Sequence, residues 1–176
     1  MYATEGIVLK RFDAGEADYL FSIYTKDFGK IRARAQGIKK ETAKLKGHLE
    51  TLSRAHVSFV IGKSGERLTH AMLADFWPGI RGDFAREAMA RYIAELFDEQ
   101  CLVGERDYAL WRLLLELFEE LEKKPFGEDL ADVRSAISAF TACFYIRFLD
   151  CLGYNGEKDI RVLQTRVESP FRRSKL

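Results

Sequence analysis

The chain has 176 residues, of which 47% are hydrophobic, so it is long enough for one or two domains and its composition excludes intrinsic disorder. Its formal net charge is only +1, but basic residues outnumber acidic ones by 13 to 9 in residues 1–80 and by 6 to 2 in residues 158–176. Residues 81–157 are acidic, with 9 basic against 16 acidic side chains, so the sequence predicts regions that face different partners.

Strands are expected in the first 77 residues, where polar and apolar residues tend to alternate. The clearest case is Lys30–Gln36, which places Ile31, Ala33 and Ala35 on one face and Arg32, Arg34 and Gln36 on the other. The other expected strands are Ile7–Arg11, Asp18–Thr25, Ala55–Ile61 and Arg67–Trp77, with a hairpin turn at Gly62–Gly65. Five short antiparallel strands fit a small closed barrel better than a sandwich, which usually has seven or more.

Helices are expected after Trp77–Asp83, whose proline and glycines end the strand pattern. Asp83 is the expected N-cap of a first helix with the apolar stripe Phe84, Ala88, Tyr92 and Leu96, flanked by Met89, Ile93 and Phe97. Two more amphipathic helices are expected at Asp107–Lys123 and Asp129–Leu152, the latter ended by Gly153. We expect the three helices to pack together and against the barrel, because one amphipathic helix cannot bury its own stripe.

The predicted organisation is therefore α+β, with a barrel domain at residues 1–80, a helical domain at 81–157 and a basic tail at 158–176. The three cysteines form no Cys-x-x-Cys pair, so neither a disulfide framework nor a zinc cluster is expected. Ala139–Ile146, the longest nearly apolar run, is too short for a membrane span of about 20 residues, and the first residues lack a signal-peptide pattern. We expect a cytoplasmic protein with no membrane contact.

No catalytic or metal-binding constellation is found in the sequence. Phosphate-binding glycine loops, a dinucleotide-binding fingerprint and a nucleophile elbow are all missing. His48, His56 and His70 are not at metal-ligand spacing with a second ligand, and the acidic runs at Glu95–Glu99 and Glu116–Glu122 have the spacing of helix surfaces. A non-catalytic protein without a cofactor is expected.

A cationic segment gives the strongest functional signal. Between residues 26 and 46 the chain carries eight basic residues against two acidic ones. Alternation places Arg32 and Arg34 on the outer face of one strand, and the lysine-rich loop Gly37–Gly47 follows directly, as a phosphate backbone would require. The candidate phosphate-binding residues are Lys10, Arg11, Lys30, Arg32, Arg34, Lys39, Lys40, Lys44 and Lys46.

Aromatic residues near this segment have two possible roles. The residues are Phe12, Tyr19, Phe21, Tyr24 and Phe28, and each either fills the barrel or, if it points outward, could stack on a base. In the helical half, the apolar stripes either only close the core or leave a groove for an acidic, apolar peptide, rimmed by Arg86, Arg91 and Arg112.

Three segments resemble the bacterial recombination mediator RecO. They are "TEGIVLKRFDAGEADYLFSIYTKDFGKIRARAQGIKK" (Thr4–Lys40), "LKGHLETL" (Leu45–Leu52) and "LADFWPGIRGD" (Leu73–Asp83), and "FLDCLGY" (Phe148–Tyr154) resembles a landmark of the helical half. The resemblance implies an N-terminal OB-fold, a helical domain and a non-enzymatic protein that binds single- and double-stranded DNA and anneals strands. It also implies the partners RecR and the acidic tail of single-strand-binding protein, and with them the loading of recombinase.

One feature departs from the family pattern. Many family members carry a four-cysteine zinc module after the "LGY" point, whereas no cysteine follows Tyr154 here, so no zinc is expected. Two other functions remain open from the sequence: a barrel that acts as a protein-binding adaptor, and an RNA-binding OB protein.

Overall fold

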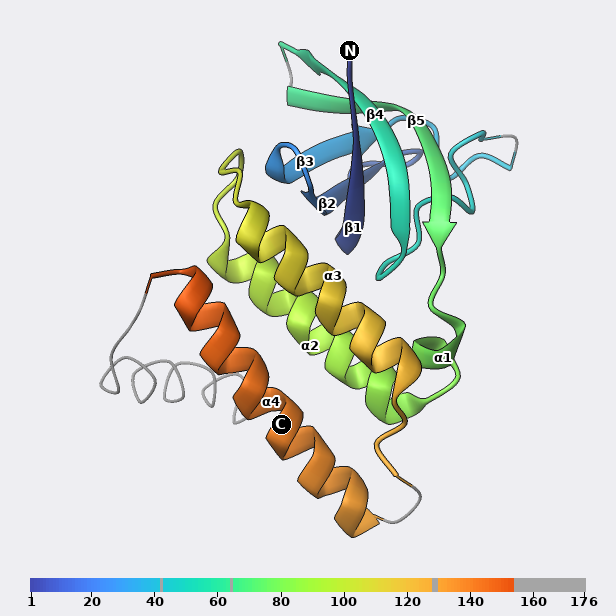
Figure 1. Cartoon of the computed structure of the whole chain (residues 1–176). Helices are drawn as coiled ribbons and strands as arrows, with labels where there is room; N and C mark the ends of the chain where they lie inside the picture. Colours follow the sequence, from blue (N-terminus) through green and yellow to red (C-terminus); the bar gives the residue numbers. More distant parts are fainter. Residues whose placement is uncertain (42, 64, 128–129, 154–176) are drawn as a thin grey trace, which may run out of the picture. The chain divides into compact units, whose positions relative to one another are not determined.

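The computed structural model describes residues 1–41, 43–63, 65–127 and 130–153, and its first half is a five-stranded barrel (Figure 1). The strands are β1 (Tyr2–Asp13), β2 (Tyr19–Thr25), β3 (Gly29–Ala35), β4 (Arg54–Gly62) and β5 (Gly65–Asp75). They close in the order β1-β2-β3-β5-β4. The predicted barrel is confirmed, with one correction: β3 and β5 pair in parallel, so the sheet is mixed.

Alternation along β3 fills the barrel as predicted. Ile31, Ala33 and Ala35 are at most 3% exposed and belong to the core, whereas Arg32 and Arg34 are exposed. The loop between β3 and β4 closes one end, because Ile38 and Leu49 are buried in the same core. Apolar side chains therefore anchor this loop to the core, so the backbone that carries its lysines is held in place.

Strand β1 is longer than predicted and is irregular at Leu9. Its pairing with β2 shifts between Val8 and Lys10, which indicates a β-bulge. Ile7, Val8 and Leu9 are consecutive and all at most 3% exposed, which a regular strand with one wet face would not allow. The bulge lets the strand bend around the barrel while both of its faces are covered.

Within the described residues, four helices follow the barrel: α1 (Pro78–Arg81), α2 (Phe84–Gln100), α3 (Tyr108–Lys123) and α4 (Leu130–Cys151). Asp83 caps α2 as predicted, with its carboxylate accepting from the amides of Ala85 at 2.9 Å and Arg86 at 3.1 Å. Gly153 follows α4 with φ +80°, in the left-handed region expected of a glycine that ends a helix. No helix in the described part of the chain is long and apolar enough to cross a membrane.

The chain divides into two compact units, Met1–Pro125 and Phe126–Leu176. In the first unit, α2 and α3 lie side by side below the barrel, and α2 packs against β1 and β2 (Figure 1). In the second unit, α4 is the described element. The predicted boundaries after residues 80 and 157 stay predictions, and the basic tail at 158–176 lies outside the described residues.

The buried face of α2 is rotated by one residue from the predicted stripe. Phe84, which we expected to face inward, is 90% exposed, whereas Ile93 and Phe97 are fully buried. The sequence offers two adjacent stripes with i, i+4 spacing, and α2 has to cover both α3 and the barrel. Packing on two sides selects the stripe that includes Ala90 and Ala94, whose small side chains permit close approach.

Candidate nucleic-acid interface

Lys30 lies inside the molecule, which corrects its predicted place on the outer cationic surface. It is only 4% exposed. The segment that follows α2 lies along this end of β3, because Val103 forms a bridge with Lys30 and the amide of Gly104 donates to the Lys30 carbonyl at 2.8 Å. Its ammonium donates to the backbone carbonyl of Asp98 and lies 3.9 Å from the Asp98 carboxylate. That carboxylate also accepts from the hydroxyl of Ser22 at 2.5 Å. Lys30 therefore joins α2 to the barrel and is not available to a phosphate.

Further along the same face, α2 no longer covers the barrel. The strand register aligns two rows of outward side chains across β1, β2 and β3: Lys10, Ser22 and Arg32 form the first, and Phe12, Leu20 and Arg34 the second. Lys10 lies 3.8 Å from Glu95 of α2, so the first row marks the edge of the helix. The helix does not cover the second row. From the two rows together, we call the three cations and the aromatic residue, namely Lys10, Arg32, Arg34 and Phe12, the outer group.

A second set of cations lies around Tyr19, the residue that begins β2. The Arg11 guanidinium is 4.6 Å and the Lys39 ammonium 4.7 Å from the centre of the Tyr19 ring. Lys39 also binds the Asp13 carboxylate at 2.6 Å and the carbonyl of Gly15 at 2.8 Å. This hydrogen bond and the charge of Lys39 lower the pKa of Asp13 from its usual value. Lys39 thus fixes the β1–β2 turn as well as adding positive charge.

Three predicted lysines lie in the loop that closes the barrel, namely Lys40, Lys44 and Lys46, and all three are exposed. Tight turns hold their backbone: the amide of Lys40 donates to the carbonyl of Gly37 at 3.1 Å, and the amide of Lys46 to that of Ala43 at 3.0 Å. The lysine positions are therefore set by an anchored loop, although their side chains reach into water.

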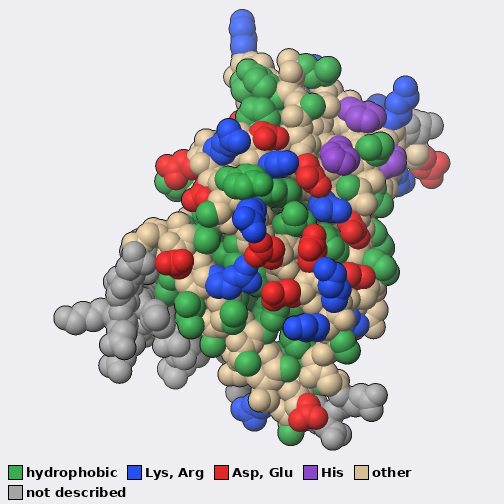
Figure 2. Space-filling model, in the orientation of Figure 1, with side chains coloured by type: hydrophobic (Ala, Val, Ile, Leu, Met, Phe, Trp, Pro, Cys, Tyr) green, Lys and Arg blue, Asp and Glu red, His purple; other side chains and the backbone are tan. Residues whose placement is uncertain are grey.

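Carboxylates from distant parts of the sequence pair with about half of the predicted phosphate-binding residues. Within the described residues, five of the nine candidates have an acidic partner within 4 Å: Lys10 with Glu95, Arg11 with Glu50, Lys30 with Asp98, Arg34 with Asp18, and Lys39 with Asp13. The described side chains place no carboxylate at that distance from Arg32, Lys40, Lys44 or Lys46. Figure 2 shows the same mixture, with acidic and basic side chains interspersed on the face in view.

The three arginines predicted to rim a peptide groove have intramolecular partners. Arg86 donates to the carbonyls of Leu121 and Glu122, at 3.4 and 3.2 Å, and so ties the start of α2 to the end of α3. Arg91 pairs with Glu87 at 2.6 Å, and Arg112 with Glu116 at 3.0 Å, in each case one turn away along the helix. The peptide-binding role of these arginines stays a prediction.

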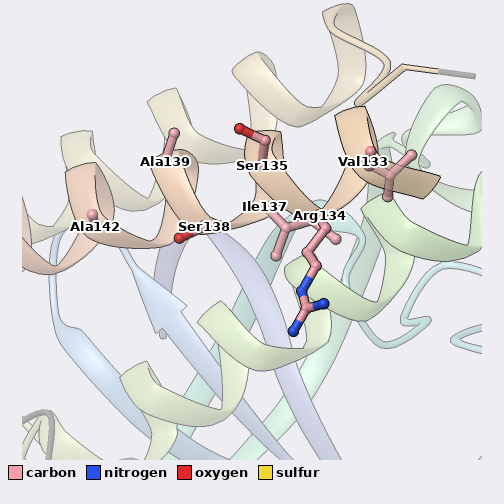
Figure 3. Close-up of a pocket in the computed structure, with 8 residues that line it drawn as sticks. Val133, Arg134, Ser135, Ile137, Ser138, Ala139 and Ala142 are labelled. Atoms are coloured by element: carbon pink, nitrogen blue, oxygen red, sulfur yellow. The ribbon is translucent and has the colours of Figure 1, made fainter. Parts of the chain in front are cut away.

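A depression of about 1100 Å³ runs along α4 and includes none of these arginines. Most of its described lining residues are small, among them Ser135, Ala139 and Ala142, and Arg134 is the charged one of that described set. Figure 3 shows Arg134 and Ile137 leaving the helix on one side and Ser135 on the other. Among the described residues of its lining there is no carboxylate, histidine or cysteine of the kind that a catalytic or metal site needs.

The histidines gather near β5 and not at a metal centre. His56 and His70 are exposed and line a depression of about 400 Å³ with Met72, and Figure 2 shows histidine side chains close together on one part of the face in view. The Nδ1 atom of His48 accepts from the amide of Leu73 at 3.4 Å. In the part of the chain that the structure describes, no group of three or more His, Cys, Asp or Glu residues could hold a metal ion.

Sequence reasoning missed Asp98 and the individual role of Phe12. Asp98 comes one turn after Ala94 on the buried stripe, and a carboxylate at such a position is a usable signal for a buried ion pair. Phe12 was one of five aromatic candidates, and only the register of β1 against β2 shows that its ring faces outward beside Lys10 and Arg32.

Residues 1–76 match the family model described as "Recombination protein O N terminal". A protein named DNA repair protein RecO from Dehalococcoides mccartyi is 35% identical over 121 residues, which cover 69% of this chain and 48% of the relative. Proteins of the same name from Geobacter metallireducens and a Nostoc species are 32% identical over 151 residues and 30% identical over 169, covering 86% and 96% of this chain. The chain belongs to the RecO family.

The family match covers all five strands and ends just before α1. The barrel is therefore the OB-fold with which RecO proteins begin, and the helices follow it as the resemblance implies. The chain spans about half the length of these relatives, with 58% of the Geobacter protein and 55% of the Nostoc protein covered. The segment in which we expected no zinc module, after Tyr154, lies outside the described residues.

Proposed function

We propose that this chain is a non-enzymatic, DNA-binding recombination mediator that holds single- and double-stranded DNA on its barrel and promotes annealing of complementary strands. The observation that carries the proposal is the set of exposed cations without an acidic partner among the described residues, namely Arg32, Lys40, Lys44 and Lys46. The relatives named DNA repair protein RecO support DNA as the polyanion.

The mechanism is electrostatic. Each phosphate that meets a lysine or arginine releases condensed counterions, so binding gains entropy and needs little sequence readout. The surface pairs Lys10–Glu95 and Arg34–Asp18, at 3.8 Å each, are worth at most about 1 kcal/mol, so a phosphate can replace the carboxylate. Neutralising two strands on one surface lowers their mutual repulsion, which is the barrier to annealing.

Partners enter the proposal through the family resemblance. With RecR, the protein would remodel single-strand-binding protein on DNA so that recombinase can load. The acidic tail of single-strand-binding protein would bind the helical half near Arg91 and Arg112, whose exposed ion pairs can exchange for a peptide carboxylate. We propose that these activities take place in the cytoplasm, with the chromosome.

A salt series on matched charge variants tests the DNA-binding surface. Arg32→Gln, Arg34→Gln and Lys40→Gln together remove three barrel cations, and Arg112→Gln, Lys123→Gln and Lys124→Gln remove three from α3 and the residue after it. If each barrel cation meets one phosphate, the slope of log affinity against log salt falls by about 2 for single-stranded DNA. Fluorescence anisotropy with an oligonucleotide measures both affinity and slope.

The two triple variants have to differ if the barrel is the site. Equal loss in both would show a general charge effect and would contradict the proposed surface. No binding of DNA by the parent chain at low salt would favour a protein-binding adaptor, and a clear preference for RNA of the same sequence would favour an RNA-binding OB protein. Lys39 is left unchanged because it also holds the β1–β2 turn through Asp13 and Gly15.

A further inference from the structure

Phe12 occupies the uncovered part of the outer face of the barrel. It lies next to Leu20 across the β1–β2 pair and two residues beyond Lys10, where α2 no longer covers the strands. Its ring is half-buried, in contrast to Phe21, which is fully buried in the barrel core. The flat side chain is thus held by its neighbours and remains accessible from solvent.

Two cations lie beside this ring. The Lys10 ammonium is 5.6 Å and the Arg32 guanidinium 5.7 Å from the centre of the Phe12 ring. Both distances are near the outer limit of about 6 Å for a cation–π contact, so the contacts are weak and the cations can turn toward an anion. Lys10 is paired with Glu95, whereas no described carboxylate lies within 4 Å of Arg32.

We propose that Phe12 is a base-stacking residue and that Arg32 and Lys10 bind the phosphates on either side of the stacked nucleotide. The inference rests on the proposed function and adds to it the class of ligand that this place recognises: an unpaired nucleotide. An aromatic ring beside two cations matches the two parts of a nucleotide, an apolar flat base and a charged phosphate. In a duplex the bases are paired and stacked on each other, so only the cations find a partner there.

The site therefore separates two contributions to binding. Arg32 and Lys10 attract any phosphate backbone, single or double, whereas Phe12 favours strands whose bases are free. A mediator that anneals strands gains from this division, because its hold on each nucleotide weakens once the base has paired.

The experiment compares Phe12→Leu with Phe76→Leu. Phe76 is also exposed, at 44%, and has an arginine guanidinium, that of Arg81, 3.9 Å from its ring centre, but it lies after β5, away from the outer group. Leucine keeps the apolar cover in both variants while removing the ring. The ligands are an oligothymidylate, an abasic oligonucleotide of the same length and a duplex, all at one salt concentration.

We expect Phe12→Leu to weaken oligothymidylate binding about tenfold, within the range measured for single stacking residues, and to leave duplex and abasic binding unchanged. Phe76→Leu should leave all three unchanged. Phe12→Trp should restore the affinity, and its added indole emission should change on binding oligothymidylate but not the abasic strand.

Other results overturn the inference. Equal losses for oligothymidylate and duplex, or equal behaviour of the Phe12 and Phe76 variants, would show that the ring does not meet a base while the proposed DNA binding still stands. If the parent chain binds none of the three ligands, the proposed function itself fails and the inference fails with it.

Discussion

Replacing Asp98 with alanine tests whether a buried ion pair locks α2 to the barrel. The carboxylate is 7% exposed, lies 3.9 Å from the ammonium of Lys30, which is 4% exposed, and accepts from Ser22 at 2.5 Å. Alanine removes the negative charge and leaves the positive one in the interior. We expect a less stable protein, because the fold would then bury an uncompensated ammonium group.

The expected loss of unfolding free energy depends on the hydrogen bond that Lys30 retains in the variant. Removing one partner of a buried pair costs about 3–5 kcal/mol, and the lower end applies here because the backbone carbonyl of Asp98 still accepts from Lys30. The Ser22 hydroxyl also loses its acceptor, which adds about 1 kcal/mol. A total of about 4 kcal/mol lowers the melting temperature by roughly 8–16 °C for a chain of this size.

Urea unfolding followed by the emission of Trp77 and Trp111, both in the first unit, measures the loss. Glu99→Ala, at an exposed neighbouring position, is the control and should change stability by at most about 0.5 kcal/mol. The double variant Lys30→Met, Asp98→Leu should recover most of the loss and keep the parent's DNA affinity.

Two outcomes would refute this reasoning. The first is an Asp98→Ala variant as stable as Glu99→Ala, which would mean that the pair contributes nothing. The second is a Lys30→Met, Asp98→Leu variant whose cost equals the sum of the costs of Lys30→Met alone and Asp98→Leu alone, because coupled residues must deviate from additivity. Should Asp98→Ala not fold, Ser22→Ala removes one hydrogen bond only, and its expected cost of about 1 kcal/mol keeps the test open.

Gly29→Ala should destabilise the barrel by at least about 2 kcal/mol, because a Cβ there would lie 1.8 Å from the carbonyl oxygen of Glu105 at a φ of +63°. Gly37→Ala, with φ +65° and only an ordinary 3.8 Å contact to Lys40 Cδ, isolates the backbone strain, and an equal loss of unfolding free energy in both variants would exclude the clash. Cys101 should resist a maleimide at pH 8 in the folded protein, because burial raises the pKa of its thiol to about 12 and so depletes the thiolate. Exposed Cys143 should react first, and mass spectrometry showing equal labelling rates would contradict this expectation.

Local patterns in the sequence predict much of the fold because the physics that they report is local. The alternation in Lys30–Gln36 decides which side chains of β3 enter the core, and Asp83 caps its helix through amides two and three residues away. The same patterns do not choose between two neighbouring stripes on one helix. Phe84 and Phe97 are equally apolar, and only packing against α3 and the barrel leaves Phe84 in water.

The candidate site divides in the same way. The sequence by itself determined that eight basic residues gather within residues 26–46 and that Arg32 and Arg34 share a face, because charge and alternation are properties of neighbouring residues. The tertiary structure decided which cations remain available, because Asp98 and Glu95 reach β3 and β1 only after α2 has packed on the barrel. Lys30 is buried and joins α2 to the barrel, while Phe12 and Arg32 lie just beyond the edge of that helix.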